Sequence, residues 1–414
     1  MPNEYNRTPA SEIVVGGREM LDPKVMRRIF VNLLLVLAAL AVGAALIEVG
    51  TRLVIGLPKP YPLKPNSYVF DRRGFWTVRP GLNDAFDNDV DFRNAAVNVG
   101  PLGARRTACT ENGSAPAVRL FLIGDSQTFG WGLADAETWA SGLQCALSKA
   151  RPGAFRVYNF GVPGTQVDQY WSRAAAQVAP AVRPGDVVVV SVTWNDLVTF
   201  YAGKAFVDRA VADAASVTGA AGGLELQLAE PLRYLDPPTW RYRVYEDYGL
   251  FVPSIESAKA FGESMVHVSA AFGLLWNRAR LLYYRLRPAD SFAKKVDADA
   301  FEHNFRTLKA IAAVLERRGA RVIVQLLPNR LFFDDFYYAS YSKNGVAFPA
   351  RDYMGHIAEP YCRDLDLACV NRFADLLTAQ RDAHTFAVDG HYNAAGAARV
   401  AAALGQDVLM AAPK

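Results

Sequence analysis

Three residues carry the side chains that acyl transfer on a serine requires: Ser126 and, far from it in the sequence, Asp389 and His391. This chemistry needs a hydroxyl nucleophile, a base within hydrogen-bond reach, and a carboxylate that orients the base. Asp389 and His391 are two positions apart, so their side chains point the same way in an extended loop. We therefore predict Ser126 as the nucleophile, His391 as the base and Asp389 as the orienting acid.

The oxyanion formed in such a reaction needs hydrogen-bond donors, and the sequence offers three. The backbone N–H of Ser126 lies at a turn entering a helix, Gly164 lets the backbone approach a substrate closely, and Asn195 carries an amide. Trp194 is a candidate for lining the substrate pocket, with packing in the core as the alternative. Asp125 is expected to stabilise the turn before Ser126 rather than to act as an acid.

The elements that position these residues alternate between strands and helices from about residue 118. Short apolar runs bounded by turn residues predict buried strands, and apolar residues at helical spacing predict amphipathic helices. Predicted strands cover 118–123, 155–160, 186–192, 321–327 and 365–371, and predicted helices cover 137–149, 166–178, 298–318 and 394–409 with Asn393 as N-cap. This alternation predicts a parallel, doubly wound α/β sheet, in which ligands bind at the carboxyl ends of the strands.

Residues 29–57 are predicted to form a transmembrane helix. From 29 to 47 the chain is almost purely apolar, with Asn32 as the polar exception, and the stretch is long enough to span a bilayer. The alternative is a cleaved signal peptide, with the small residues 44–45 near a cleavage site. The long charged segment before the apolar run favours an uncleaved anchor.

Positive charge gathers on the amino side of this helix, where Lys24, Arg27 and Arg28 stand. By the positive-inside rule, the tail 1–28 is predicted to be cytoplasmic and the body of the protein to be exported.

Three further segments follow the helix. Residues 58–116 are rich in Pro, Gly, Asn and Arg and are predicted to form a loop-rich collar with short strand-like pieces. The main domain is predicted over 117–412, with an insertion at 198–291 that is expected to be a functional loop or lid. Within the insertion, 266–286 is predicted as a packed helix, with a helix on the membrane surface as the alternative.

Composition excludes some functions and bears on the compartment. A net charge of +4, without a basic and aromatic platform, gives no reason to expect nucleic acid as a partner. The four cysteines lack metal-ligand spacing, so no metal is expected. Cys362 with Cys369 is the local pairing, which leaves Cys109 with Cys145; the alternative is four reduced core cysteines.

The chain resembles the SGNH, or GDSL-type, serine hydrolase superfamily, and in particular bacterial members tethered by an N-terminal helix. That family carries Gly-Asp-Ser, Gly, Asn-Asp and Asp/His blocks in this order, and here they stand at 124–126, 161–164, 195–196 and 389–391. The resemblance covers about 117–409 and implies a three-layer flavodoxin-like α/β fold. It implies the same site roles: Ser126, His391 and Asp389 for catalysis, and Ser126, Gly164 and Asn195 for the oxyanion.

One spacing departs from the common family pattern. The family usually has two residues between the aspartate and the histidine, whereas here Gly390 alone separates them. This shorter spacing is similar to that of polysaccharide-modifying relatives.

These features predict a serine esterase that acts through an acyl-enzyme and deacetylates an envelope or extracellular polysaccharide or glycoconjugate. The expected partners are an acylated glycan or small ester and the membrane, with no cofactor. An alternative is an O-acyltransferase that uses the same site beside a membrane acyl-donor protein; another is a non-catalytic glycan-binding or assembly component. The expected location is a bacterial inner membrane, with one span, the N-terminus inside and the catalytic domain in the periplasm.

Overall fold

The computed structural model divides into two units, Met1–Leu57 and Pro58–Lys414. The structure describes residues 22–55, 68–70, 76–87, 91–110, 116–198, 269–286, 298–343, 348 and 350–411. Most of the predicted tail, the first residues of the collar, and most of the predicted insertion, 199–268, lie outside the described residues.

The first unit contains one helix, α1 (Pro23–Ile55), among the residues described for it. Its mean hydropathy reaches 2.7, and by length and composition it could cross a membrane, as no other helix in the described part of the chain could. Asp22 caps its start by accepting a hydrogen bond from the backbone N–H of Lys24 at 2.8 Å, and Pro23 occupies the first helical position. The helix therefore begins six residues before the predicted boundary at 29 and includes the basic residues.

The second unit is built on a five-stranded parallel sheet with the strand order β6-β5-β7-β8-β9. The strands are β5 (Val118–Gly124), β6 (Phe155–Gly161), β7 (Val187–Thr193), β8 (Arg321–Leu327) and β9 (Cys369–Asn371). This is the flavodoxin-like order of doubly wound folds. From β5 the chain adds β6 at one edge and then β7, β8 and β9 on the other side, so the topological switch point lies between β5 and β7. The predicted parallel α/β sheet is confirmed.

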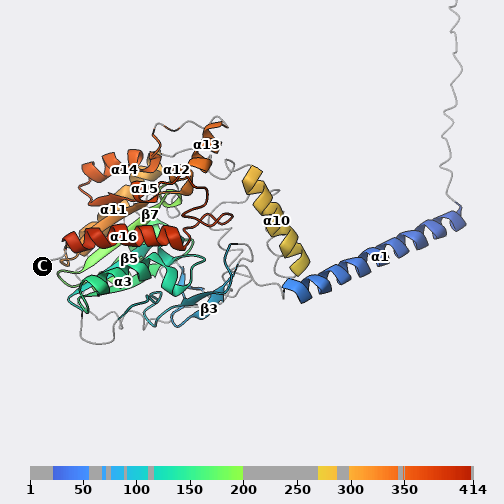
Figure 1. Cartoon of the computed structure of the whole chain (residues 1–414), viewed down its shortest axis with the longest axis horizontal. Helices are drawn as coiled ribbons and strands as arrows, with labels where there is room; N and C mark the ends of the chain where they lie inside the picture. Colours follow the sequence, from blue (N-terminus) through green and yellow to red (C-terminus); the bar gives the residue numbers. More distant parts are fainter. Residues whose placement is uncertain are drawn as a thin grey trace, which may run out of the picture. The chain divides into compact units, whose positions relative to one another are not determined.

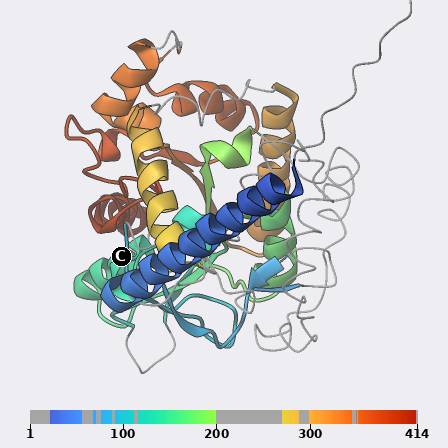
Figure 2. The ribbon, with the colours of Figure 1, turned by 90° about the vertical axis from the view of Figure 1, so that its right-hand side faces the viewer.

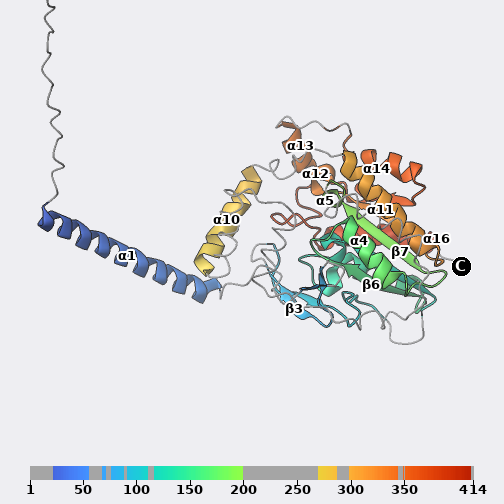
Figure 3. The same cartoon turned by 180° about the vertical axis from the view of Figure 1, so that it is seen from behind.

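Helices cover both faces of this sheet. One face packs on α3 (Trp139–Ala150) and α16 (Ala394–Ala411), and the other on α4 (Val167–Arg173), α11 (Ala298–Glu316) and α14 (Tyr353–Asp364). Figure 1 shows α3 and α16 side by side on one face, and Figure 3 shows α4 and α11 on the other. In Figure 2, turned by 90°, the red α16 and the green α4 lie on opposite sides of the second unit.

The sequence alternation along β5 explains how one strand serves both layers. Leu120 and Leu122 join the core cluster with α3 and α16, whereas Phe121 and Ile123 join the cluster with α4 and α11. Every residue of β7 is buried, as its run of valines predicted.

Some boundaries differ from the predictions. The strand predicted over 365–371 is confined to β9, because α14 runs to Asp364 and Asp366 adopts a left-handed φ of 49° in the following turn. Asn393 caps α16 as predicted, since its side chain accepts from the N–H groups of Ala395 and Gly396 at 3.0 Å. The helices that were not predicted include α5 (Trp194–Leu197), α12 (Arg330–Phe333), α13 (Asp335–Lys343), α14 and α15 (Phe373–Leu376).

The helix predicted at 266–286 is present as α10 (Ala270–Leu286). However, Leu275 is 68% exposed and Leu282 is 56% exposed. The prediction of a packed helix is therefore wrong for this side of α10, because these leucines find no apolar cover among the described residues.

In its described residues the collar forms two antiparallel strand pairs, β1 (Tyr68–Phe70) with β2 (Trp76–Val78) and β3 (Asn83–Phe86) with β4 (Ala95–Asn98). Phe86 and Val97 share a core cluster with three residues at the carboxyl edge of the main sheet. These are Phe129, in the short helix that follows β5, and Trp131 and Val162, in the loops that come after this helix and after β6. The collar is thus packed against the segments that follow β5 and β6.

All four cysteines form disulfides. Cys109 bonds Cys145 and links the collar to α3, and Cys362 bonds Cys369 and links α14 to β9. Both predicted pairings are confirmed, and the alternative of four reduced cysteines is wrong.

Candidate active site

Ser126 is the first residue of a short helix, α2 (Ser126–Phe129), that directly follows β5. The Asp125 carboxylate caps this helix by accepting a hydrogen bond from the backbone N–H of Gln127 at 2.8 Å. Gly130 ends the helix with a left-handed φ of 85°, a conformation that favours glycine. The strand, cap and helix together place the Ser126 hydroxyl at the carboxyl edge of the sheet, and the expected capping role of Asp125 is confirmed.

The structure brings Ser126, His391 and Asp389 into one chain of hydrogen bonds. Ser126 Oγ lies 2.7 Å from His391 Nε2, and His391 Nδ1 is hydrogen-bonded to Asp389 Oδ1. Both contacts are satisfied when Nδ1 carries the proton and Nε2 accepts from the serine hydroxyl. Gly390, between the acid and the base, has a φ of 85°, so the loop turns sharply and both side chains reach the same side.

The environment of His391 sets its basicity. Burial lowers the pKa of His391, but the charge of Asp389 and its hydrogen bond, together with the charge of Asp125, outweigh this effect, while Arg330 opposes them. The pKa therefore lies above its ordinary value of 6.5. Asp389 has 7% of its side chain exposed and His391 25%, so the imidazole can be reached from solvent while the carboxylate is shielded.

Two contacts position the acid loop, and the sequence analysis missed both. The Trp131 indole N–H donates to Asp389 Oδ2 at 3.2 Å, and the Arg330 guanidinium donates to the carbonyl oxygens of Phe386 and Ala387 at 3.0 Å. Trp131 lies in the Gly-Trp-Gly string after the nucleophile helix, which is a usable signal. In both bonds of Arg330 the acceptor is a backbone carbonyl oxygen. Because every residue type has such an oxygen, these contacts leave no motif in the sequence.

Two buried carboxylates, those of Asp125 and Asp196, are linked through Thr193 next to Ser126. Thr193 Oγ1 is 3.2 Å from Asp125 Oδ2 and 3.0 Å from Asp196 Oδ2, and the Tyr170 hydroxyl donates to Asp196 at 3.0 Å. Burial raises the pKa of Asp125, although the charge of His391 opposes it. Burial, and then the charge of Asp125, raises the pKa of Asp196 well above its ordinary value. Both effects act in the direction of the neutral form of Asp196.

The three predicted oxyanion donors follow neighbouring strands. Ser126 comes after β5, Gly164 after β6, and Asn195 after β7 in α5 (Trp194–Leu197). Gly164 is exposed with a φ of 76°, and Asn195 is exposed. The Asn195 amide donates to Asp196 Oδ1 at 3.4 Å, and its carbonyl oxygen accepts from Thr193 Oγ1 at 2.8 Å. Their assignment to the oxyanion stays a prediction.

Trp194 does not line the site. Its side chain is 4% exposed and packs against Phe301, Phe332 and Tyr353, with ring centroids 5.4–5.8 Å away. The predicted substrate-lining role is wrong, because the first residue of α5 turns its side chain into the core layer formed with α11, α12 and α14.

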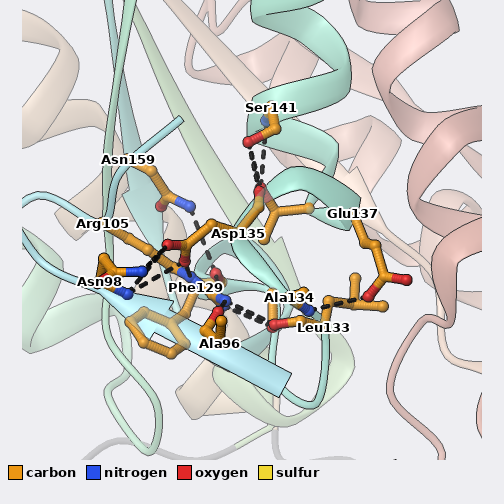
Figure 4. Close-up of polar contacts among 12 residues, drawn as sticks. Ala96, Asn98, Arg105, Phe129, Leu133, Ala134, Asp135, Glu137, Ser141 and Asn159 are labelled. Atoms are coloured by element: carbon orange, nitrogen blue, oxygen red, sulfur yellow. Dashed lines mark hydrogen bonds and ion pairs between the residues drawn. The ribbon is translucent and has the colours of Figure 1, made fainter. Parts of the chain in front are cut away.

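A buried arginine of the collar holds the segment after the nucleophile helix. The Arg105 side chain is fully buried and donates to the carbonyl oxygens of Phe129, Gly130 and Leu133 at 2.5–2.9 Å. It also pairs with Asp135 at 2.8 Å, as Figure 4 shows. Backbone from residue 129 to 133 is therefore fixed by a side chain that precedes Ser126 by about twenty positions.

Among the described residues no group of three or more His, Cys, Asp or Glu side chains could hold a metal ion. The expectation that the protein needs no cofactor stays a prediction.

Comparison with known proteins finds similarity to solved structures and to nothing else that was compared. No protein-family model and no curated protein matches the chain. A member of the lipolytic protein G-D-S-L family from Veillonella parvula is 12% identical, with 71% of this chain and 99% of that chain covered and a TM-score of 0.34. An acetylxylan esterase from Geobacillus stearothermophilus, in a catalytic mutant, is 13% identical, with 71% and 95% covered and a TM-score of 0.36.

A carbohydrate acetylesterase from Sinorhizobium meliloti is 10% identical, with 71% of this chain and 99% of that chain covered and a TM-score of 0.34. These three structural neighbours are thus one G-D-S-L lipolytic protein and two acetylesterases. At these identities and TM-scores the likeness assigns no substrate to this chain.

Proposed function

We propose that this chain is a serine esterase that acts through an acyl-enzyme. The observation that carries the proposal is the hydrogen-bond chain from Ser126 through His391 to Asp389 at the carboxyl edge of a parallel sheet. His391 Nε2 takes the proton from Ser126 Oγ as the oxygen attacks the ester carbonyl, and then gives that proton to the leaving alcohol. Water, deprotonated by the same nitrogen, attacks the acyl-enzyme; the bond between the acyl carbon and Ser126 Oγ breaks, His391 returns the proton to Oγ, and the acid is released.

Charge that develops on the carbonyl oxygen needs donors at this edge. The backbone N–H groups of Ser126 and Gly164 and the Asn195 amide are the proposed oxyanion donors. For Asn195 this role requires its amide to turn from Asp196 toward the substrate.

The proposed substrates are acetylated polysaccharides or glycoconjugates of the cell envelope or outside it. Two features support this class. The Asp–x–His spacing is similar to that of polysaccharide-modifying relatives, and α1 with two disulfides suits an exported, membrane-anchored protein, since disulfides persist in oxidising compartments. We propose a bacterial inner membrane, with the N-terminus inside and the catalytic unit in the periplasm.

The test is Ser126→Ala in the full chain, assayed on p-nitrophenyl acetate and on a panel of acetylated polysaccharides. Removal of the nucleophile is expected to lower kcat by at least about 10³-fold with the fold intact. Ser342→Ala, at an exposed serine of α13, is the matched control and is expected to keep wild-type activity. Wild-type turnover by Ser126→Ala would contradict the proposal. Failure of a fluorophosphonate to label Ser126 in folded wild-type protein would favour a non-catalytic glycan-binding role.

An O-acyltransferase with the same site is the second candidate. It is favoured by α1, because a membrane helix would keep the catalytic unit near a membrane protein that donates acyl groups. The two candidates differ in acceptor dependence. A transferase acetylates an added glycan faster than it hydrolyses the donor, whereas an esterase releases acetate at a rate that the glycan does not change.

A further inference from the structure

A carboxylate of the collar contacts the loop that carries the candidate acid. Asp91, in the connection between β3 and β4, accepts hydrogen bonds from the backbone N–H of Val388 at 3.1 Å and from that of Asp389 at 2.7 Å. Each oxygen of the carboxylate takes one of the two bonds. Hydrogen bonds to an ionised acceptor are among the stronger ones, so this pair fixes the backbone from which the Asp389 side chain projects.

Aromatic packing joins the same two segments. Phe92, next to Asp91, lies 5.3 Å from Phe386 between ring centroids. Phe86 of β3 lies 5.6 Å from Trp131, whose indole N–H donates to Asp389. The collar therefore reaches the Asp389 carboxylate by two routes, one through the backbone and one through an indole.

The collar also holds the nucleophile half of the site. Arg105, just after β4, donates to the carbonyl oxygens of Phe129 and Gly130 at the end of α2. One segment of the chain thus contacts both the helix that begins with Ser126 and the loop that carries Asp389 and His391.

We propose that Asp91 is a positioning residue of the candidate triad and that the collar completes the active site instead of serving only as a spacer. The catalytic part of this inference rests on the proposed function. Without the Asp91 carboxylate, Val388 and Asp389 lose the acceptor that fixes their backbone. The Asp389 side chain then supports the His391 imidazolium less well.

The experiment compares Asp91→Ala and Asp91→Asn with wild type in the full chain. Asp84→Ala is the matched control, because Asp84 is an acidic residue of the same collar whose side chain accepts a hydrogen bond from its neighbour Ala85. We expect kcat per titrated Ser126 to fall about 10- to 100-fold in Asp91→Ala, with KM within about threefold of wild type, since misplaced catalytic groups act mainly on the chemical step. The Asp91→Asn side chain keeps one acceptor oxygen, so its kcat is expected to lie between those of Asp91→Ala and wild type.

A second readout separates positioning from folding. The pKa of His391 is measured by NMR on the full chain in detergent, with His391→Gln to assign the resonance. Asp389, Asp125 and Arg330 are the charged groups that act on this imidazole. Asp91→Ala is expected to lower the pKa of His391, because the support of Asp389 is weakened. Partial unfolding would reduce the number of active sites but would leave the pKa of the folded protein unchanged.

An unchanged His391 pKa in folded Asp91→Ala would overturn the inference. If Asp91→Ala does not fold, the same comparison is made with Asp91→Asn. The NMR measurement needs no substrate, so a wild-type protein that cleaves no ester would contradict the proposed function and would leave the test of Asp91 in place.

Discussion

At the scale of single residues, the site depends on a histidine that must be neutral to accept a proton. Burial alone would keep His391 neutral, but the neighbouring carboxylates Asp389 and Asp125 favour its charged form and raise its pKa above 6.5. This makes His391 a stronger base and moves the loss of its neutral form to a higher pH. Arg330 limits the shift.

Activity should therefore fall as the pH drops through the raised pKa of His391. The acid limb of kcat/KM for ester hydrolysis is expected above pH 6.5, because the free enzyme is active only with a neutral imidazole. Asp389→Asn removes the charge that raises this pKa, so its acid limb should move to lower pH while kcat falls by about 10³- to 10⁴-fold. A pH–rate profile with the same acid limb in Asp389→Asn and wild type would contradict this assignment.

At the scale of elements, the position of Ser126 depends on close contact between β6 and α2. A Cβ added to Gly161, the last residue of β6, would lie 2.3 Å from Phe129 N and 2.6 Å from Thr128 C. These are backbone atoms of α2, which cannot move aside as a flexible side chain could. A glycine is thus required here by space, since its backbone conformation is ordinary.

Gly161→Ala is expected to displace α2 and, with it, the Ser126 hydroxyl. The expected result is a fall in kcat of about 100-fold and a loss of about 1–3 kcal/mol in the free energy of unfolding. Gly405→Ala in α16 is the control, because its added Cβ would meet nothing nearer than 3.7 Å and alanine favours a helix. Equal kcat and thermal stability in Gly161→Ala and wild type would show that α2 tolerates the methyl group.

At the scale of the whole molecule, an apolar helix of 33 residues precedes a unit that contains the candidate site and both disulfides. A helix of this length rises about 50 Å, which exceeds the hydrocarbon thickness of a bilayer. The basic residues Lys24, Arg27 and Arg28 lie in its first turns and would face the cytoplasm under the proposed topology.

This topology predicts that a reporter at the C-terminus lies outside the cytoplasm. In a bacterial host, alkaline phosphatase fused after residue 414 should be active, since that reporter requires an oxidising compartment to form its disulfides. An N-terminal tag should stay on the full-length protein in the membrane fraction. Loss of the tag would instead indicate a cleaved signal peptide, and an inactive phosphatase fusion would contradict export.

Much of the candidate site could be predicted from the sequence because the necessary information is local. Ser126 follows a strand and starts a helix, and Asp389 and His391 share one short loop, so residue type and spacing determine their chemistry. The strands of the sheet, the apolar helix and the Cys362–Cys369 pair likewise follow from patterns of a few residues. These are properties that one segment carries by itself.

Only the tertiary structure decided which side chains lie at the site and which are buried in the core. Trp194 stands beside Asn195 in sequence, but packing against three helices buries it. Asp91 and Arg105 contact backbone groups of distant segments, and every residue type presents such groups, so these contacts leave no pattern in the sequence. The chemistry of the site is therefore encoded by local residue types, whereas its geometry depends on long-range packing of the collar against the sheet edge.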